Sequence, residues 1–209
     1  MNKTAGRVYV ATEYITKFAY LNLLWIGFSL LGLVVLGFFP ATIAMFTIIR
    51  KWLMGEMDTP IFSTFWTTYK AEFLRSNGLG YIMVVVGGLI VLDLVFMRNS
   101  GSNMMSMVQI PLYMFMFAAV MTMFYLFPVY VHYELKLTQM IKNSFLMMLI
   151  SPLENLVIIT GLAAVVLVGK FLPGLAFFFG GSLSAAIIMA ACFLVFNKME
   201  KKQQSQKQN

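Results

Sequence analysis

A run of thirty-two residues without a charged side chain, from Phe18 to Ile49, is the feature that most constrains this chain. A single helix of that length would measure about 48 Å, whereas the hydrocarbon core of a bilayer is roughly 30 Å thick. Pro40 interrupts the run near its middle, and proline disfavours continuation of a helix. We therefore expect the run to form two antiparallel membrane-spanning helices joined by a turn at Pro40.

The distribution of basic residues favours the same turn. With a turn at Pro40, thirteen of the fifteen lysines and arginines lie on one side of the membrane, and only Arg98 and Lys170 lie on the other. Cytoplasmic segments of membrane proteins carry an excess of Lys and Arg. We therefore expect six spans in the cell membrane, with the N- and C-termini both in the cytoplasm.

The composition indicates that this multi-pass region occupies nearly the whole chain. Hydrophobic residues make up 60% of the 209 residues and charged residues only 11%, which leaves no room for a soluble domain of ordinary size. The sequence predicts an all-α polytopic membrane protein with one transmembrane domain over residues 1–197 and a disordered basic cytoplasmic tail over 198–209. The six predicted transmembrane helices form three hairpins and cover residues 18–39, 41–54, 78–97, 107–131, 152–171 and 174–196.

Two cytoplasmic connections have the pattern of amphipathic helices. The first follows Pro60, and its large apolar residues share one helical face: Ile61, Phe62, Phe65, Trp66, Tyr69 and Phe73. The second is weaker, and its apolar stripe contains Leu137, Ile141, Phe145 and Met148. It precedes a predicted capping box that begins at Ser151 and ends at Glu154. We expect the first segment to lie along lipid headgroups or against a partner.

Three polar residues are candidates for a role within or beside the membrane. Asp93 lies inside an apolar stretch. A charge in such a stretch is costly, so Asp93 is a functional candidate. Because Arg98 follows five residues later, we favour an interfacial ion pair or a hydrogen-bonded structural carboxylate for Asp93. His132 and Glu134 lie at the inner end of the fourth span, where we favour interfacial hydrogen bonding by the histidine over proton coupling.

Motifs for catalysis are absent from the sequence. It contains no nucleotide-binding Gly-x-x-x-x-Gly-Lys-Ser/Thr, no His-Glu-x-x-His and no Gly-x-Ser-x-Gly, and its one cysteine, Cys192, cannot form an intramolecular disulfide. We expect no enzymatic activity and no cofactor. The formal net charge of +7 is explained by anionic lipid at the cytoplasmic face, so we expect no nucleic-acid partner.

Several motifs resemble those of the YesL family of small bacterial membrane proteins. They are Asn22-Leu23-Leu24-Trp25, Pro40-Ala41-Thr42 followed by Arg50-Lys51-Trp52, Phe65-Trp66 with Tyr69-Lys70 and Phe73, and Phe127-Pro128 followed by His132-Tyr133-Glu134-Leu135-Lys136-Leu137. The resemblance covers most of residues 18–155 and departs at Phe38-Phe39, where smaller residues are expected. Family genes commonly neighbour carbohydrate-importing ABC transporter genes in Gram-positive bacteria. The resemblance therefore implies an association with sugar import but supplies no established site residues.

We therefore expect a non-enzymatic accessory membrane subunit associated with the permease subunits of a carbohydrate ABC importer. The residues expected to contact such a partner are basic or aromatic: Arg50, Lys51, Trp52, Phe62, Phe65, Trp66, Tyr69 and Phe73. One alternative is a stand-alone small-solute transporter or channel, with Asp93 and His132 on its pathway. The other alternative is a lipid-interacting membrane protein that uses the first amphipathic segment.

Overall fold

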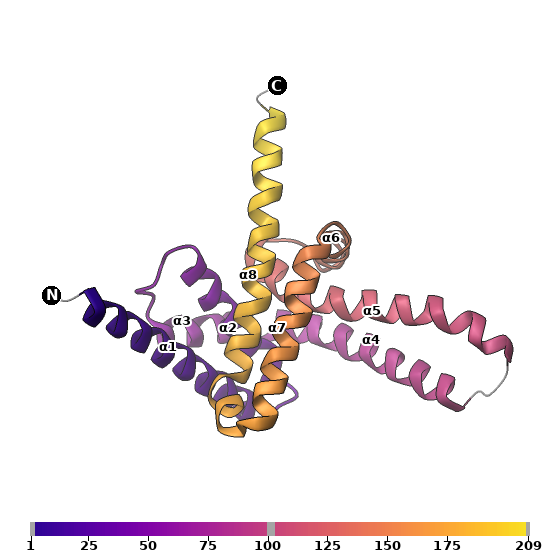
Figure 1. Ribbon diagram of the computed structural model, residues 1–209, viewed down its shortest axis with the longest axis horizontal. Helices are drawn as coiled ribbons and strands as arrows, with labels where there is room; N and C mark the ends of the chain where they lie inside the picture. The colour runs from indigo at the N-terminus through magenta and orange to yellow at the C-terminus, as the bar shows by residue number, and fades with distance from the viewer. Residues whose placement is uncertain (1–2, 100–102, 208–209) are drawn as a thin grey trace.

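The computed structural model describes residues 3–99 and 103–207, and within these ranges the chain is built from α-helices without strands (Figure 1). The helices in chain order are α1 (Lys3–Leu31), α2 (Phe38–Leu53), α3 (Ile61–Ala71), α4 (Phe73–Asn99), α5 (Asn103–His132), α6 (Leu137–Ile150), α7 (Pro152–Phe171) and α8 (Pro173–Lys207). The all-α prediction is therefore confirmed. Five of the helices are long and apolar enough to cross a membrane, namely α1, α4, α5, α7 and α8.

The apolar run of α1 and α2 is broken before Pro40, so the predicted position of the turn is wrong. The turn lies at Gly32–Gly37, and Pro40 is the third residue of α2. A proline is tolerated there because the N–H groups of the first helical turn have no partner within the helix. The chain does reverse: Lys17 Nζ on α1 donates to the carbonyl of Met57, just beyond α2, at 2.9 Å.

Glycine allows the tight path of this turn. A Cβ atom on Gly32 would overlap the backbone of Gly37, so the two segments approach this closely only without a side chain there. Between them, Leu33 and Val34 have left-handed backbone conformations, with φ of 55° and 64°. Such values are unfavourable for a β-branched residue, so the turn is held by the helices on either side.

Helix α2 is a buried core helix. Ten of its sixteen residues are buried, and at about 24 Å it is shorter than the hydrocarbon core of a membrane. The segment predicted as the second span, residues 41–54, is almost entirely helical. Its helix, however, is not one of the five that are long enough to span a membrane. Its apolar character comes from burial inside the protein, which hydrophobicity alone does not distinguish from exposure to lipid.

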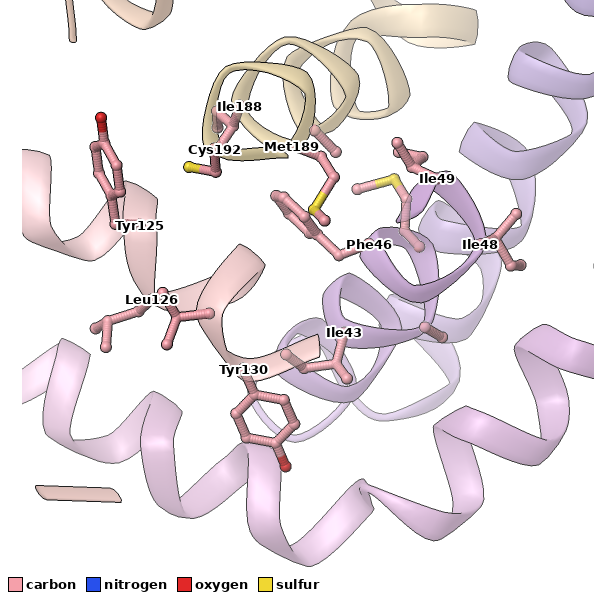
Figure 2. Close-up of a cluster of buried hydrophobic side chains, with 14 of the residues drawn as sticks. Ile43, Phe46, Ile48, Ile49, Tyr125, Leu126, Tyr130, Ile188, Met189 and Cys192 are labelled. Atoms are coloured by element: carbon pink, nitrogen blue, oxygen red, sulfur yellow. The ribbon is translucent and has the colours of Figure 1, made fainter. Parts of the chain in front are cut away.

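The main core forms where α2 meets α5 and α8. Ile43, Phe46 and Ile49 of α2 belong to one buried cluster with Leu126 of α5 and Met189 of α8, and Figure 2 shows the Phe46 ring beside Met189. The rings of Phe46 and Phe127 stack with centroids 5.4 Å apart. Cys192 is fully buried in the same core, as a small apolar residue would be.

The long helices α4 and α5 leave this core together and project as a hairpin, whereas α7 and α8 run side by side in another direction (Figure 1). Large apolar side chains on α4 are exposed over much of its length, for example Leu92 at 66%. A helix that is apolar on all sides and still exposed suits contact with lipid. The two helix pairs therefore do not share one direction.

The second amphipathic segment is helical, and its buried face agrees only in part with the predicted stripe: Met148 is buried and Leu137 and Ile141 pack against the core. Helix α6 buries Met140, Ser144, Met147 and Met148, whereas Phe145 is exposed. Three of the four buried residues of α6 are methionines, and other apolar residues of the helix are exposed, so apolar spacing alone did not single out the buried face.

Residues 198–207 of the predicted disordered tail continue α8 as a helix to Lys207, and 208–209 lie outside the described residues. Lys, Gln and Glu are good helix formers, and extension of an existing helix avoids the cost of nucleation.

Candidate functional site

The aromatic face predicted for residues 61–73 folds against one residue of α1. Phe28 lies within 5.1 to 6.4 Å, between ring centroids, of Phe62, Phe65, Trp66 and Tyr69 on α3. The Tyr69 hydroxyl also donates to the Phe28 carbonyl at 3.3 Å. Burial raises the pKa of Tyr69, which keeps this hydroxyl protonated as a donor.

Only half of this aromatic face is covered. Phe65 and Tyr69 are 0% and 7% exposed, whereas Phe62 and Trp66 are 52% and 40% exposed. The ammonium of Lys70 lies 4.6 Å from the centre of the Trp66 ring. We call Phe62, Trp66 and Lys70 the aromatic edge of α3. It is held firmly because its neighbours on the same helix are packed into the core.

Two further predicted aromatic residues have structural contacts. Trp52 packs edge-on against Phe18 of α1 at 5.3 Å, and Phe73 packs against Tyr69 at 5.7 Å. Lys51 lies 3.9 Å from the carboxylate of Glu56. Trp52 is buried and Phe73 is half-buried, so these two residues are less accessible to a partner than the aromatic edge.

Arg50 and His132, predicted separately, lie together. Arg50 Nε donates to His132 Nδ1 at 3.1 Å, and His132 Nε2 lies 3.5 Å from Glu200 of α8. Because Nδ1 accepts a hydrogen bond, the neutral ring carries its proton on Nε2, facing Glu200. The imidazole also stacks on Phe196 at 4.3 Å. The cluster joins α2, α5 and α8.

The other polar candidates lie apart from this cluster or at its border. Asp93 is on the exposed stretch of α4 and forms no hydrogen bond or ion pair with any residue whose side chain is described. The side chain of Arg98, its predicted partner, lies outside the described residues. Glu134 is exposed in the link between α5 and α6. The three predicted polar residues therefore do not converge on one intramembrane site.

A groove of about 1000 Å³ opens between α3, the start of α4 and the link from α5 to α6. Among its lining residues, the Tyr130 hydroxyl donates to Glu72 at 2.5 Å. Arg75 donates to the carbonyl of Leu135 at 2.8 Å, and its guanidinium lies 5.1 Å from the centre of the Tyr130 ring. Figure 2 shows the Tyr130 hydroxyl pointing away from the core residues around Ile43. The sequence did not mark Tyr130, because tyrosines are common in such an apolar chain.

The predicted capping box at the start of α7 is wrong. The Ser151 side chain makes no capping hydrogen bond, and Glu154 instead accepts from Lys198 of α8 at 2.5 Å. Beside it, Asn155 accepts from the Tyr125 hydroxyl at 2.8 Å. These contacts join α5, α7 and α8, and they satisfy a buried carboxylate as its burial requires.

The described residues place no group of three or more metal-ligating side chains together. The groove offers hydrogen-bonding and charged groups, and the aromatic edge offers exposed rings beside a lysine.

Comparison with known proteins extends the sequence similarity beyond residue 155. A family model described as "Protein of unknown function, DUF624" matches residues 18–94. "Uncharacterized protein YteU" of Bacillus subtilis is 36% identical over 94% of this chain and 88% of its own length. "Uncharacterized protein YesL" of the same organism is 34% identical over 93% of this chain and 91% of its own length. "Uncharacterized protein YesV" is 36% identical over 92% of this chain and 93% of its own length. No solved structure matches the chain.

Proposed function

Because the chain belongs to the YesL-like family, whose members include relatives of nearly its full length, we propose that it is a non-enzymatic accessory subunit that binds another membrane protein. The binding surface in this proposal is the aromatic edge of α3.

The observation that carries the proposal is the split burial of the α3 aromatic face. Phe65 and Tyr69 anchor the helix, and this fixes Phe62 and Trp66 in exposed positions beside Lys70. Tryptophan is enriched among the residues that dominate binding energy at interfaces. A rigid tryptophan loses little conformational entropy on binding, so it is well suited to serve as an anchor for a partner.

The partner class in the proposal is a permease subunit of a carbohydrate ABC importer. The support for this class is the gene neighbourhood that the family resemblance implies. The structural part of the proposal, a partner that binds the aromatic edge, is independent of which transporter that partner belongs to.

The proposal includes a topology with both chain ends in the cytoplasm. Contacts between distant residues support it: Lys17 meets Met57, and Arg50 meets His132, which in turn lies beside Glu200. They bring Lys17 of α1 to the segment after α2, and Arg50 near the end of α2 to His132 at the end of α5, beside Glu200 of α8, which favours a basic layer at this end of α2. Anionic cytoplasmic lipid would then face this basic layer.

The stand-alone transporter remains the rival function, and the described residues give it less support. A transport pathway usually brings polar groups from several spans together near the middle of the membrane. Here Asp93 is exposed on α4, whereas His132 is bound by Arg50 and packed on Phe196 at the end of α5.

Affinity purification in mild detergent tests the proposal. The tagged chain should retain a membrane protein that is identified by mass spectrometry, and Phe62→Ala with Trp66→Ala should reduce its recovery at least about tenfold. The matched control is Phe115→Ala, because Phe115 is 69% exposed on α5, away from the aromatic edge. Equal loss of the partner with the control, or no partner with the unmodified chain, would refute the proposed function.

A further inference from the structure

We propose that the groove between α3 and the α5–α6 link binds the headgroup of a phospholipid, with the phosphate held by Arg75 and Lys136. The headgroup that fits best is phosphoethanolamine, because its ammonium can be held by Glu134. This site lies on the other side of α3 from the aromatic edge, since its α3 residues are Thr67, Thr68 and Ala71. The inference therefore does not depend on the proposed function.

The position of the groove suits a lipid headgroup. Glu72 and Arg75 lie where the candidate span of α4 begins at Phe73, and Tyr130 and Glu134 lie where the candidate span of α5 ends at His132. The groove therefore lies where the span of α4 starts and the span of α5 ends, at one surface of the membrane. Lipid phosphates lie at this depth, and the exposed apolar surface of the two helices is available to acyl chains.

The cations in the groove are available to a phosphate. Among the described side chains, neither Arg75 nor Lys136 forms an ion pair, although Arg75 is fixed by the Leu135 carbonyl and the Tyr130 ring. Only one of the guanidinium's five N–H donors is used in that contact. A guanidinium that is already oriented loses less entropy when it binds a phosphate, and such charge-assisted hydrogen bonds are strong.

The acidic residues of the groove decide the class of headgroup. Glu72 already accepts the Tyr130 hydroxyl, whereas Glu134 has no hydrogen bond or ion pair to a described residue. The groove has two cations and two carboxylates, so a zwitterion complements it better than an anion does. The ammonium of ethanolamine can donate to Glu134, whereas the quaternary ammonium of choline has no N–H to donate.

Native mass spectrometry of the purified full chain, titrated separately with phosphatidylethanolamine, phosphatidylglycerol and phosphatidylcholine, tests this inference. The unmodified chain should bind phosphatidylethanolamine about tenfold more tightly than phosphatidylcholine. Arg75→Gln should weaken binding of both lipids about tenfold. Glu134→Gln should remove the preference for ethanolamine and leave phosphate binding intact.

Lys142→Gln is the matched control, because Lys142 is exposed on α6 and does not line the groove. It should change no affinity. The thermal unfolding midpoint of each variant establishes that it is folded, and Glu134→Gln keeps the test valid if Arg75→Gln does not fold. Equal binding of the three lipids by the unmodified chain, preference for phosphatidylglycerol, or an equal loss in Lys142→Gln would overturn the inference.

A titration with a soluble headgroup distinguishes a membrane lipid from a soluble phosphate ester as the ligand. Glycerophosphoethanolamine, which lacks acyl chains, should bind at least about a hundredfold more weakly than the lipid, because burial of acyl chains contributes to lipid binding. If this soluble headgroup bound as tightly as the lipid, the ligand would be a soluble phosphate ester and the assignment to a membrane lipid would be overturned.

Discussion

Arg50 Nε on α2 donates a 3.1 Å hydrogen bond to His132 Nδ1 on α5, joining two residues 82 positions apart in the sequence. We expect this pair to contribute to stability as a unit, because the imidazole also stacks on Phe196 of α8. In a double-mutant cycle with Arg50→Gln and His132→Gln, the coupling free energy should be about 0.5–1.5 kcal/mol.

Thermal or denaturant unfolding in detergent measures this coupling. Gln139→Ala provides the control, because Gln139 is exposed on α6 and forms no described side-chain hydrogen bond. Strict additivity of Arg50→Gln and His132→Gln would mean that the hydrogen bond does not stabilise the fold.

Close packing of α1 on α8 predicts that alanine substitutions at two adjacent glycines have different effects on stability. Asn22 donates to the carbonyl of Phe177 at 2.7 Å and accepts from the N–H of Ser182 at 2.9 Å. A Cβ atom on Gly181 would come within 2.8 Å of Asn22 Oδ1, whereas one on Gly180 would meet nothing closer than 3.9 Å. Gly181→Ala should therefore destabilise the protein by about 1–3 kcal/mol.

Gly180→Ala is the matched control and should be neutral or slightly stabilising, because alanine favours the helix over glycine. Unfolding midpoints of the two variants in one detergent make the comparison. If Gly180→Ala cost as much as Gly181→Ala, the described contact between α1 and α8 would not explain the effect.

The proposed topology predicts a labelling pattern in a Cys192→Ala background. Thr67→Cys should be labelled by a membrane-impermeant maleimide only after the cells are permeabilised, because Thr67 is exposed on α3 at the proposed cytoplasmic face. Lys170→Cys, exposed at the end of α7, should be labelled in intact cells. The reverse pattern would place α3 outside the cell.

Sequence patterns predicted the helical class and the local surfaces better than the packing. The spacing from Phe62 to Tyr69 indicated one aromatic face, and α3 has that face packed in part against Phe28. Phe28 itself was missed, because an aromatic residue in an apolar helix has no pattern that distinguishes a contact with protein from a contact with lipid. The same ambiguity led to α2 being predicted as a span.

Polar contacts between distant segments were the hardest to predict. Glu154 and Lys198 are 44 residues apart, so the capping motif was the only local explanation for the glutamate. Likewise, the turn at Gly32–Gly37 depends on a close approach of two glycines, whereas Pro40 gave the stronger sequence signal for a break.

Site-specific photocrosslinking tests the central claim, that the aromatic edge of α3 binds another membrane protein. A photoreactive phenylalanine at position 66 in living cells should give one discrete adduct with a second membrane protein, because Trp66 is exposed beside Phe62. The same group at Ala71, which is exposed on the groove side of α3, should not give that adduct. Adducts from position 66 with lipid alone, or the same protein adduct from both positions, would contradict the claim.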